Sequence, residues 1–407
     1  MRLLLRNGLV IDTEPAPVAR PGTDVLIEDD RILAVGEGLP ADGAIVIDAT
    51  DRVVLPGFVD THRHLWQTAL RGAAVDADLG RYLALVTSTR YRPEDVYAAT
   101  LAGALECLDS GITTVQDFAH IVHTPSHADA GITALREAGI RAVYGYGWPL
   151  FTDAARDPAD VRRVRVEQLP DDSALVTMAL APLGPSYAPI DAVTEDWRLA
   201  RDLGLPIAVH VGSGPVAHRP VATLKKHGLL GPATLYVHGN SLPDEELDLI
   251  AASGGSMSIA PAVEALMGHG APTIGRLRKA GVTTGLGVDT VTAVAGDMFS
   301  LMRAALLSGQ LGGGPRPTAA DVLRMSTLDG AAALGLADRI GSLRPGKQAD
   351  IVLLRLAANH DPVGTVVTAA HPGNVDTVLV AGRVLKSGGT PARYTMSETV
   401  LGGAPAG

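Results

Sequence analysis

The stretch PGFVDTHRH, residues 56–64, ends an apolar run with two histidines that are separated by one residue. Side chains along a β-strand alternate between its two faces, so in a strand His62 and His64 would point to the same side. Imidazole nitrogens on one face can bind a common metal ion. This stretch therefore predicts a strand that carries two ligands of a metal site.

After this strand, short apolar runs alternate with helical patterns, which include residues 95–109, 128–138, 243–252 and 274–280. The eight apolar runs cover residues 55–62, 113–118, 141–147, 174–184, 206–210, 234–238, 255–261 and 283–289. Strands that alternate with helices predict a parallel sheet, and eight repeats predict a closed (β/α)8 TIM barrel over residues 56–340. An open doubly wound sheet is the alternative, although no Gly-x-Gly-x-x-Gly turn follows the first strand.

Both ends of the chain have a different pattern, with short apolar runs bounded by Gly, Asp and Pro. These runs lie at residues 3–5, 9–11, 25–28, 32–35, 44–48, 351–354, 377–380 and 383–385. Neither end is large enough to enclose a core by itself. We therefore expect residues 1–55 and 341–390 to pair into one small β-sandwich domain, and residues 391–407 to form a C-terminal tail.

Polar residues stand at the ends of several predicted barrel strands. His210 ends the fifth strand, His238 ends the sixth and Asp289 ends the eighth. The C-terminal ends of barrel strands meet at one mouth, where active sites are built. A single histidine at a strand end is more often an ordinary polar residue than a ligand. Together with His62 and His64, however, these residues predict a metal ion that lowers the pKa of its bound water.

The composition argues against several classes of partner and location. The formal net charge is −10, whereas phosphate binding requires a basic face, so nucleic acid is not an expected partner. The N-terminal segment does not resemble a signal peptide, and no long charge-free apolar stretch predicts a membrane span. The single cysteine, Cys107, lies in an apolar helical pattern and is expected in the core, which fits a reducing, cytoplasmic location.

Three motifs together resemble the amidohydrolase superfamily, nearest its cytosine deaminase, chlorohydrolase and aminohydrolase branch. They are PGFVDTHRH, GSLRPGKQADIVLL at residues 341–354 and VLVAGRVL at residues 378–385. The resemblance implies one divalent ion, commonly zinc with iron as the alternative, and a small-molecule substrate. It also implies a homodimer or homotetramer, because relatives often assemble in this way.

The resemblance also assigns roles to residues of the predicted mouth. The metal ligands would be His62, His64, His210 and Asp289. Asp289 would in addition act as a base towards the metal-bound water. His238 would hydrogen-bond the hydroxide or the negative charge that develops on the substrate.

One position departs from the pattern of the branch, which usually carries His-x-x-Glu at the end of strand five. This chain has His210-Val211-Gly212-Ser213, so a serine stands where the glutamate is expected, and Ser213 is itself a candidate substrate contact. A hydroxyl cannot act as a carboxylic acid near neutral pH, which puts ordinary deamination of an aromatic amidine in doubt.

Other polar residues are candidates for the pocket, although each fits a packing or surface position equally well. Candidates near strand one, where relatives often carry pocket residues, are Trp66, Gln67 and Arg71. Candidates that could contact the substrate or move protons in place of the glutamate are Asp117, His120, His123 and His269, followed by His218 and Glu264.

Three functions remain open at this point. The first is hydrolysis of a C–N bond, or a C–Cl bond, in a small heterocyclic, aromatic or amide-containing molecule. The second is a biosynthetic cyclase of specialised metabolism, in which the same metal site activates a carbonyl for ring closure with loss of water. The third is a non-catalytic binding relative, which the complete set of metal-binding residues disfavours.

Overall fold

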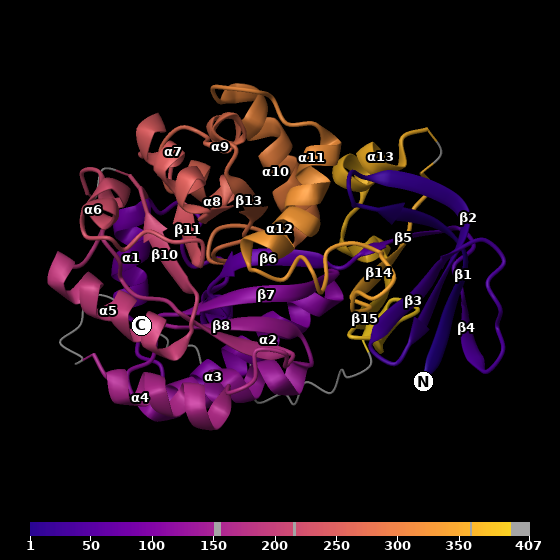
Figure 1. The fold of residues 1–407 in the computed structure, drawn as a ribbon, viewed down its shortest axis with the longest axis horizontal. Coiled ribbons are helices and arrows are strands. Elements are labelled where there is room, and N and C mark those ends of the chain that lie inside the picture. Colours follow the sequence, from indigo (N-terminus) through magenta and orange to yellow (C-terminus); the bar gives the residue numbers. More distant parts are fainter. Residues whose placement is uncertain (150–155, 215–216, 359, 392–407) are drawn as a thin grey trace.

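The computed structural model describes residues 1–149, 156–214, 217–358 and 360–391. It consists of a barrel of parallel strands surrounded by helices, with a second sheet beside the barrel (Figure 1). The predicted C-terminal tail, residues 391–407, lies outside the described residues except for Pro391. Among the described residues, no helix combines the length and apolar character needed to cross a bilayer.

The barrel contains eight parallel strands in sequence order, which confirms the predicted TIM barrel. The strands are β6 (Phe58–Arg63), β7 (Ile112–Ala119), β8 (Arg141–Tyr146), β9 (Val176–Leu180), β10 (Ile207–Val211), β11 (Thr234–His238), β12 (Ser256–Ile259) and β13 (Thr283–Leu286). The first predicted strand is wrong at its start, because Leu55 and Pro56 belong to β5 of the other sheet and Gly57 separates the two strands. The eighth is wrong at its end, because β13 stops before Asp289.

Helices cover the outside of the barrel and connect its strands (Figure 1). They are α1 (Leu79–Ser88), α2 (Pro93–Asp109), α3 (Pro125–Ala138), α4 (Pro158–Arg163), α5 (Ile190–Leu203), α6 (Pro220–Lys226), α7 (Asp244–Ser253), α8 (Pro261–Leu266) and α9 (Ile274–Ala280), and after the last barrel strand α10 (Met298–Leu311), α11 (Ala319–Met325) and α12 (Leu328–Ala333). A further helix, α13 (Pro362–Ala369), lies between two strands of the second sheet. Helix α3 illustrates the local signals, since proline occupies its first turn and Gly139 ends it with φ +74°. Cys107 of α2 is buried as predicted, and burial raises the pKa of its thiol to about 12.

The barrel closes between its first and last strands through Asp289. The Asp289 N–H donates to His62 O, and the His64 N–H donates to Asp289 O, both at 2.8 Å. Gly287 permits this approach, because a Cβ there would come within 2.8 Å of the Cβ and carbonyl oxygen of His62. The same contact therefore closes the barrel and brings His62, His64 and Asp289 of the predicted metal site together.

The second sheet is built from both chain ends, as the sequence predicted. Its strands are β1 (Arg2–Asp12), β2 (Val18–Glu28), β3 (Arg31–Gly36), β4 (Ala44–Asp48), β5 (Arg52–Pro56), β14 (Ile351–Arg355), β15 (Val375–Val380), β16 (Arg383–Ser387) and β17 (Thr390–Pro391). Residues 3–5 and 9–11 form one strand rather than two, with register shifts between them. The two ends meet where β14 pairs antiparallel with β5 (Figure 1). We propose residues 1–55 and 341–390 as one unit and residues 56–340 as the other.

A buried ion pair joins the two units. Arg141, at the start of β8, donates two hydrogen bonds to the Asp350 carboxylate at 2.8 and 2.9 Å. Both side chains are 2% exposed, and Asp350 also accepts the backbone N–H of Ala381 at 2.8 Å. The Gly-Lys-Gln-Ala-Asp motif therefore ends on a residue that fixes the terminal sheet against the barrel.

We predict that Gly287→Ala lowers the free energy of unfolding by about 1–3 kcal/mol, because the added methyl group overpacks the junction of the first and last strands. Urea denaturation measures the change. Gly231→Ala is the matched control, since a Cβ there meets no atom within 4 Å. Equal stability of the two variants would show that the junction can widen without cost.

We predict that Asp350→Ala lowers the free energy of unfolding by about 3–5 kcal/mol, because it leaves the Arg141 guanidinium buried without its partner. Thermal or urea unfolding measures the loss. Glu28→Ala serves as the control, because it removes an exposed ion pair with Arg2 and should change stability little. A loss for Asp350→Ala no larger than for the control would contradict the proposed role of the ion pair.

Candidate metal centre and active-site pocket

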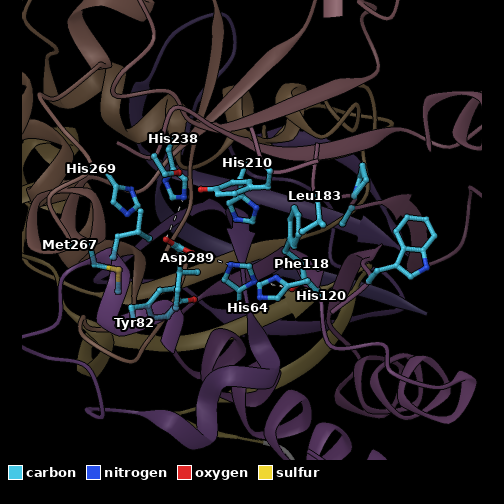
Figure 2. Close-up of a pocket in the computed structure, with 17 residues that line it drawn as sticks. His64, Tyr82, Phe118, His120, Leu183, His210, His238, Met267, His269 and Asp289 are labelled. Carbon is cyan, nitrogen blue, oxygen red and sulfur yellow. Dashed lines mark hydrogen bonds and ion pairs between the residues drawn. The ribbon is translucent and has the colours of Figure 1, made fainter. Parts of the chain in front are cut away.

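Five predicted residues meet at the C-terminal mouth of the barrel. His62 and His64 lie at the end of β6, His210 on β10, His238 at the end of β11 and Asp289 beyond β13. Figure 2 shows four of them, His64, His210, His238 and Asp289, around one point. Residues separated by more than two hundred positions in the sequence thus form one cluster.

The distances in this cluster fit a single metal ion. Asp289 Oδ1 lies 3.2 Å from the Nε2 atoms of both His62 and His64, and His62 Nε2 lies 3.2 Å from His210 Nε2. Bonds of about 2.0–2.1 Å to a tetrahedral ion would place neighbouring ligand atoms about 3.3 Å apart. A cation at the centre also explains why two imidazole nitrogens face each other. These four side chains could therefore hold a divalent ion.

The electrostatics of the cluster favour the protonation states that bind metals. Burial lowers the pKa of His62 to about 4 and holds that of His210 well below its usual value, so both rings are neutral. Burial alone would raise the pKa of the Asp289 carboxyl, but hydrogen bonds to His62 and His64 outweigh it and hold that pKa well below its usual value. Neutral imidazoles and an ionised carboxylate are the forms that coordinate a cation.

Hydrogen bonds outside the cluster orient two of its rings. His64 Nδ1 lies 2.8 Å from Phe118 O and donates to it, so with an ion bound the proton would stay on Nδ1 and Nε2 would serve as the ligand atom. His238 Nδ1 lies 3.3 Å from Glu264 Oε1. The pKa of His238 is lowered by burial, but the Glu264 and Asp289 carboxylates outweigh this effect and raise it.

The backbone is strained at two of these residues. His238 has φ +76° and Asp289 has φ +66°, a left-handed conformation that residues other than glycine rarely adopt. Such conformations persist where the surroundings enforce them, and they concentrate at functional sites. Here the strain turns both side chains to the barrel mouth, where His238 Nε2 lies 3.8 Å from Asp289 Oδ2.

A pocket that is partly open to solvent lies over the cluster (Figure 2), and its empty space, including the part that is open solvent, is about 600 Å³. Its described lining residues are His64, Leu79, Tyr82, Leu83, Phe118, His120, Trp148, Ala181, Pro182, Leu183, Tyr187, His210, Ser213, His238, Met267, His269 and Asp289. Among these, Asp289 is the single carboxylate, and none is Lys or Arg. The pocket is therefore apolar and aromatic, with imidazoles as its main polar groups.

Of the predicted substrate contacts, three line the cavity and two do not. His120, Ser213 and His269 face it. Trp66 and Gln67 are buried behind it on the short 3-10 helix η1 (Leu65–Leu70). Trp66 packs edge-on against the His120 ring with centroids 5.2 Å apart, and Gln67 Oε1 accepts the hydroxyl of the pocket residue Tyr82 at 2.9 Å. These two residues support pocket side chains without lining the cavity.

The remaining candidates lie outside the described lining. Arg71 pairs with Glu106, and His123 packs against His127. Asp117 accepts the backbone N–H of Leu65 at 3.0 Å and is buried. His218 is exposed, and Glu264 lies behind His238.

The sequence analysis did not predict the apolar and aromatic residues that form much of the pocket lining, which we call the apolar wall. Leu79, Tyr82 and Leu83 come from α1, while Trp148 and Tyr187 come from connections that follow barrel strands. Tyr187 forms a hydrogen bond with Ser213, the residue at the position of the expected glutamate, and so connects Ser213 to the apolar wall. No motif identifies these positions; the one available signal is that loops after barrel strands form the mouth.

Comparison with known proteins shows the family of this chain. The amidohydrolase family model matches residues 53–385. A 5′-deoxyadenosine deaminase of Methanothermobacter thermautotrophicus is 33% identical over 89% of this chain and 88% of its own. A 5-methylthioadenosine/S-adenosylhomocysteine deaminase of Symbiobacterium thermophilum is 31% identical over 94% and 93%.

Solved structures with bound zinc share the fold. An adenosine deaminase from Xanthomonas campestris superposes with a TM-score of 0.87 at 27% identity, covering 98% of this chain and 95% of that one. An atrazine chlorohydrolase from Arthrobacter aurescens superposes with a TM-score of 0.84 at 25% identity, covering 98% of each chain. With a family match over most of its length and a barrel mouth that gathers His62, His64, His210 and Asp289, the protein belongs to the amidohydrolase family.

Proposed function

We propose that this protein hydrolyses a C–N bond in a small, uncharged heterocyclic or aromatic molecule. His62, His64, His210 and Asp289 hold one divalent ion, with zinc as the first choice and iron as the alternative. The observation that carries the proposal is the separation of 3.2 Å between Asp289 Oδ1 and each of two imidazole nitrogens, in a pocket that has no other carboxylate among its described lining. The relatives that share the family are deaminases and a chlorohydrolase.

The ion and the side chains around it would contribute different parts of the proposed hydrolysis. A divalent ion in this position supplies Lewis-acid polarisation and acidified water. Asp289 Oδ2 points to His238 and can accept a proton at the reacting centre. His238, oriented by Glu264, hydrogen-bonds charge that develops on the substrate. The apolar residues of the lining limit the contact of these groups with bulk water.

Ser213 separates this chain from a standard deaminase of the branch. It lines the cavity and is 3% exposed, so no carboxylic acid stands beside the position of a leaving nitrogen there. The proposed C–N hydrolysis therefore suits a leaving group that needs little acid assistance, or an amide whose nitrogen another group protonates; loss of a chloride would instead be hydrolysis of a C–Cl bond.

The same observation supports a second candidate, a cyclase that forms a heterocycle with loss of water. Attack of an internal nucleophile on a polarised carbonyl also takes place without a carboxylic acid at position 213. The known relatives are hydrolytic, so hydrolysis is the first candidate. Mass spectrometry separates the two, because cyclisation gives a product that is lighter than the substrate by one water, whereas hydrolysis gives products whose masses together equal the substrate plus one water.

The proposal extends to the assembly and the location of the protein. We infer a cytoplasmic homodimer or homotetramer that acts on a small molecule. Light scattering of the purified protein measures the assembly.

We predict about one metal ion per chain, by elemental analysis of protein purified from metal-replete medium. Removal of the ion with a chelator abolishes turnover, and zinc restores it. The substrate panel contains 5′-deoxyadenosine, 5′-methylthioadenosine, atrazine and aryl amides, with products detected by mass spectrometry.

His64→Ala and Asp289→Asn should lose the ion, whereas His371→Ala, an exposed histidine outside the barrel, should keep it. Stoichiometric metal in both cluster variants, or no turnover of any panel member by the zinc-loaded wild type, would contradict the proposed function.

We predict that Ser213→Glu raises ammonia release from 5′-deoxyadenosine at least tenfold, because a carboxyl group can transfer a proton to the leaving nitrogen, and such catalysis contributes about 10²–10⁴-fold. Ser213→Ala is the control and should not raise it. Unchanged ammonia release in a folded, metal-loaded Ser213→Glu protein would show that the serine is not what limits deamination.

A further inference from the structure

We propose that His120 and His269 form a pair of substrate-positioning residues that binds an uncharged, flat heterocycle by hydrogen bonds from opposite sides of the metal centre. This inference rests on the proposed function and names the class of molecule that the site accepts. We call the two rings the histidine pair.

His269 lies in the connection after α8, against the metal cluster. Its ring packs edge-on against His238 with centroids 4.6 Å apart, and the residue is 2% exposed. Neither ring nitrogen has a hydrogen-bond partner among the described residues. Its backbone is fixed on both sides, since its N–H donates to Glu264 O at 2.9 Å and its carbonyl accepts Gly214 N–H at 3.1 Å.

His120 occupies the corresponding place on the other side. Its ring packs edge-on against His64 at 4.4 Å and against Trp66 at 5.2 Å, and the residue is 4% exposed. Both of its ring nitrogens also lack a partner among the described residues. Figure 2 shows His120 and His269 on opposite sides of Asp289.

Buried polar atoms without partners are rare, because each costs the free energy of its lost hydration. Here four such atoms, two on each ring, belong to side chains that line one cavity. A neutral imidazole offers one donor and one acceptor. The pair therefore suits a molecule with hydrogen-bonding atoms on two edges, such as the ring nitrogens and amino group of an aminoheterocycle.

The charge of the cavity restricts the rest of the substrate. No Lys or Arg is among the described lining residues, and the one carboxylate there belongs to the metal cluster. Apart from the proposed ion and its ligand Asp289, the described lining offers a charged group on a ligand no partner of opposite charge to compensate for its lost hydration. The flat body of the molecule instead meets Leu79, Leu83 and Met267.

This restriction separates the chain from relatives that accept S-adenosylhomocysteine. That molecule shares its base and thioribose with 5′-methylthioadenosine but adds an ammonium and a carboxylate group. The cavity described above has no residue that would pair with the added carboxylate. We therefore expect discrimination between these two otherwise matched molecules.

The test is calorimetric titration of the zinc-loaded, full-length protein with 5′-methylthioadenosine and S-adenosylhomocysteine. Both titrations are repeated on metal-free protein, so that a carboxylate that binds the ion itself is recognised. We expect 5′-methylthioadenosine to bind, and S-adenosylhomocysteine to bind at least tenfold more weakly.

Variants then test the histidine pair. His120→Phe and His269→Phe should each weaken the binding of 5′-methylthioadenosine at least tenfold, with unchanged zinc content. His120→Asn and His269→Asn keep a donor and an acceptor and should recover part of the loss; they also serve if the phenylalanine variants fold poorly. His123→Phe, a half-buried histidine outside the lining, is the matched control and should bind like the wild type.

Three results would overturn the proposal: no binding of 5′-methylthioadenosine to the wild type, equal affinity for the two ligands, or pair variants that bind like His123→Phe. Failure of the proposed function is recognised separately. If binding depends on the histidine pair but no panel substrate is turned over, the proposed hydrolysis is contradicted and the role of the histidine pair is supported. If substrates are turned over and the pair variants do not change this, hydrolysis is supported and the role of the histidine pair is contradicted.

Discussion

The site depends on the contact between the first and last strands of the barrel. Asp289 exchanges backbone hydrogen bonds with His62 and His64, and the same residue contributes the carboxylate that faces both imidazoles. The contact requires a glycine at position 287 and a left-handed backbone at Asp289. The contact that closes the barrel also sets the distances between the side chains of Asp289, His62 and His64. Metal affinity and the stability of the fold are therefore coupled.

The eight strands and the metal cluster were predictable from the sequence, because alternation of strands and helices and polar strand ends are local patterns. His62 and His64 share a face for the same reason that any residues two apart in a strand do. The strand boundaries were less accurate: Leu55 pairs with the terminal sheet, and Asp289 lies three residues beyond β13, because tertiary pairing decides where a strand ends. The apolar wall was not predictable, since Tyr82 reaches the pocket through the placement of a whole helix.

The pocket has a serine, Ser213, at the position where the resemblance to the family predicts a glutamate. Asp289 is the single carboxylate in the described lining. Burial keeps two of the lining imidazoles neutral: the pKa of His269 is lowered to about 3, and that of His120 lies well below its usual value. Recognition by neutral donors and acceptors selects for shape and hydrogen-bonding pattern rather than for charge.

The buried pair of Arg141 and Asp350 connects a barrel strand to a segment far along the chain, and β14 pairs with β5 from the beginning. During synthesis by a ribosome, β5 emerges about three hundred residues before its neighbour in the sheet. While the barrel is synthesised, the edge of β5 therefore lacks its neighbour β14, and the Arg141 guanidinium lacks the Asp350 carboxylate. The nascent chain has a long interval in which chaperone binding would protect it, and the terminal sheet is completed last.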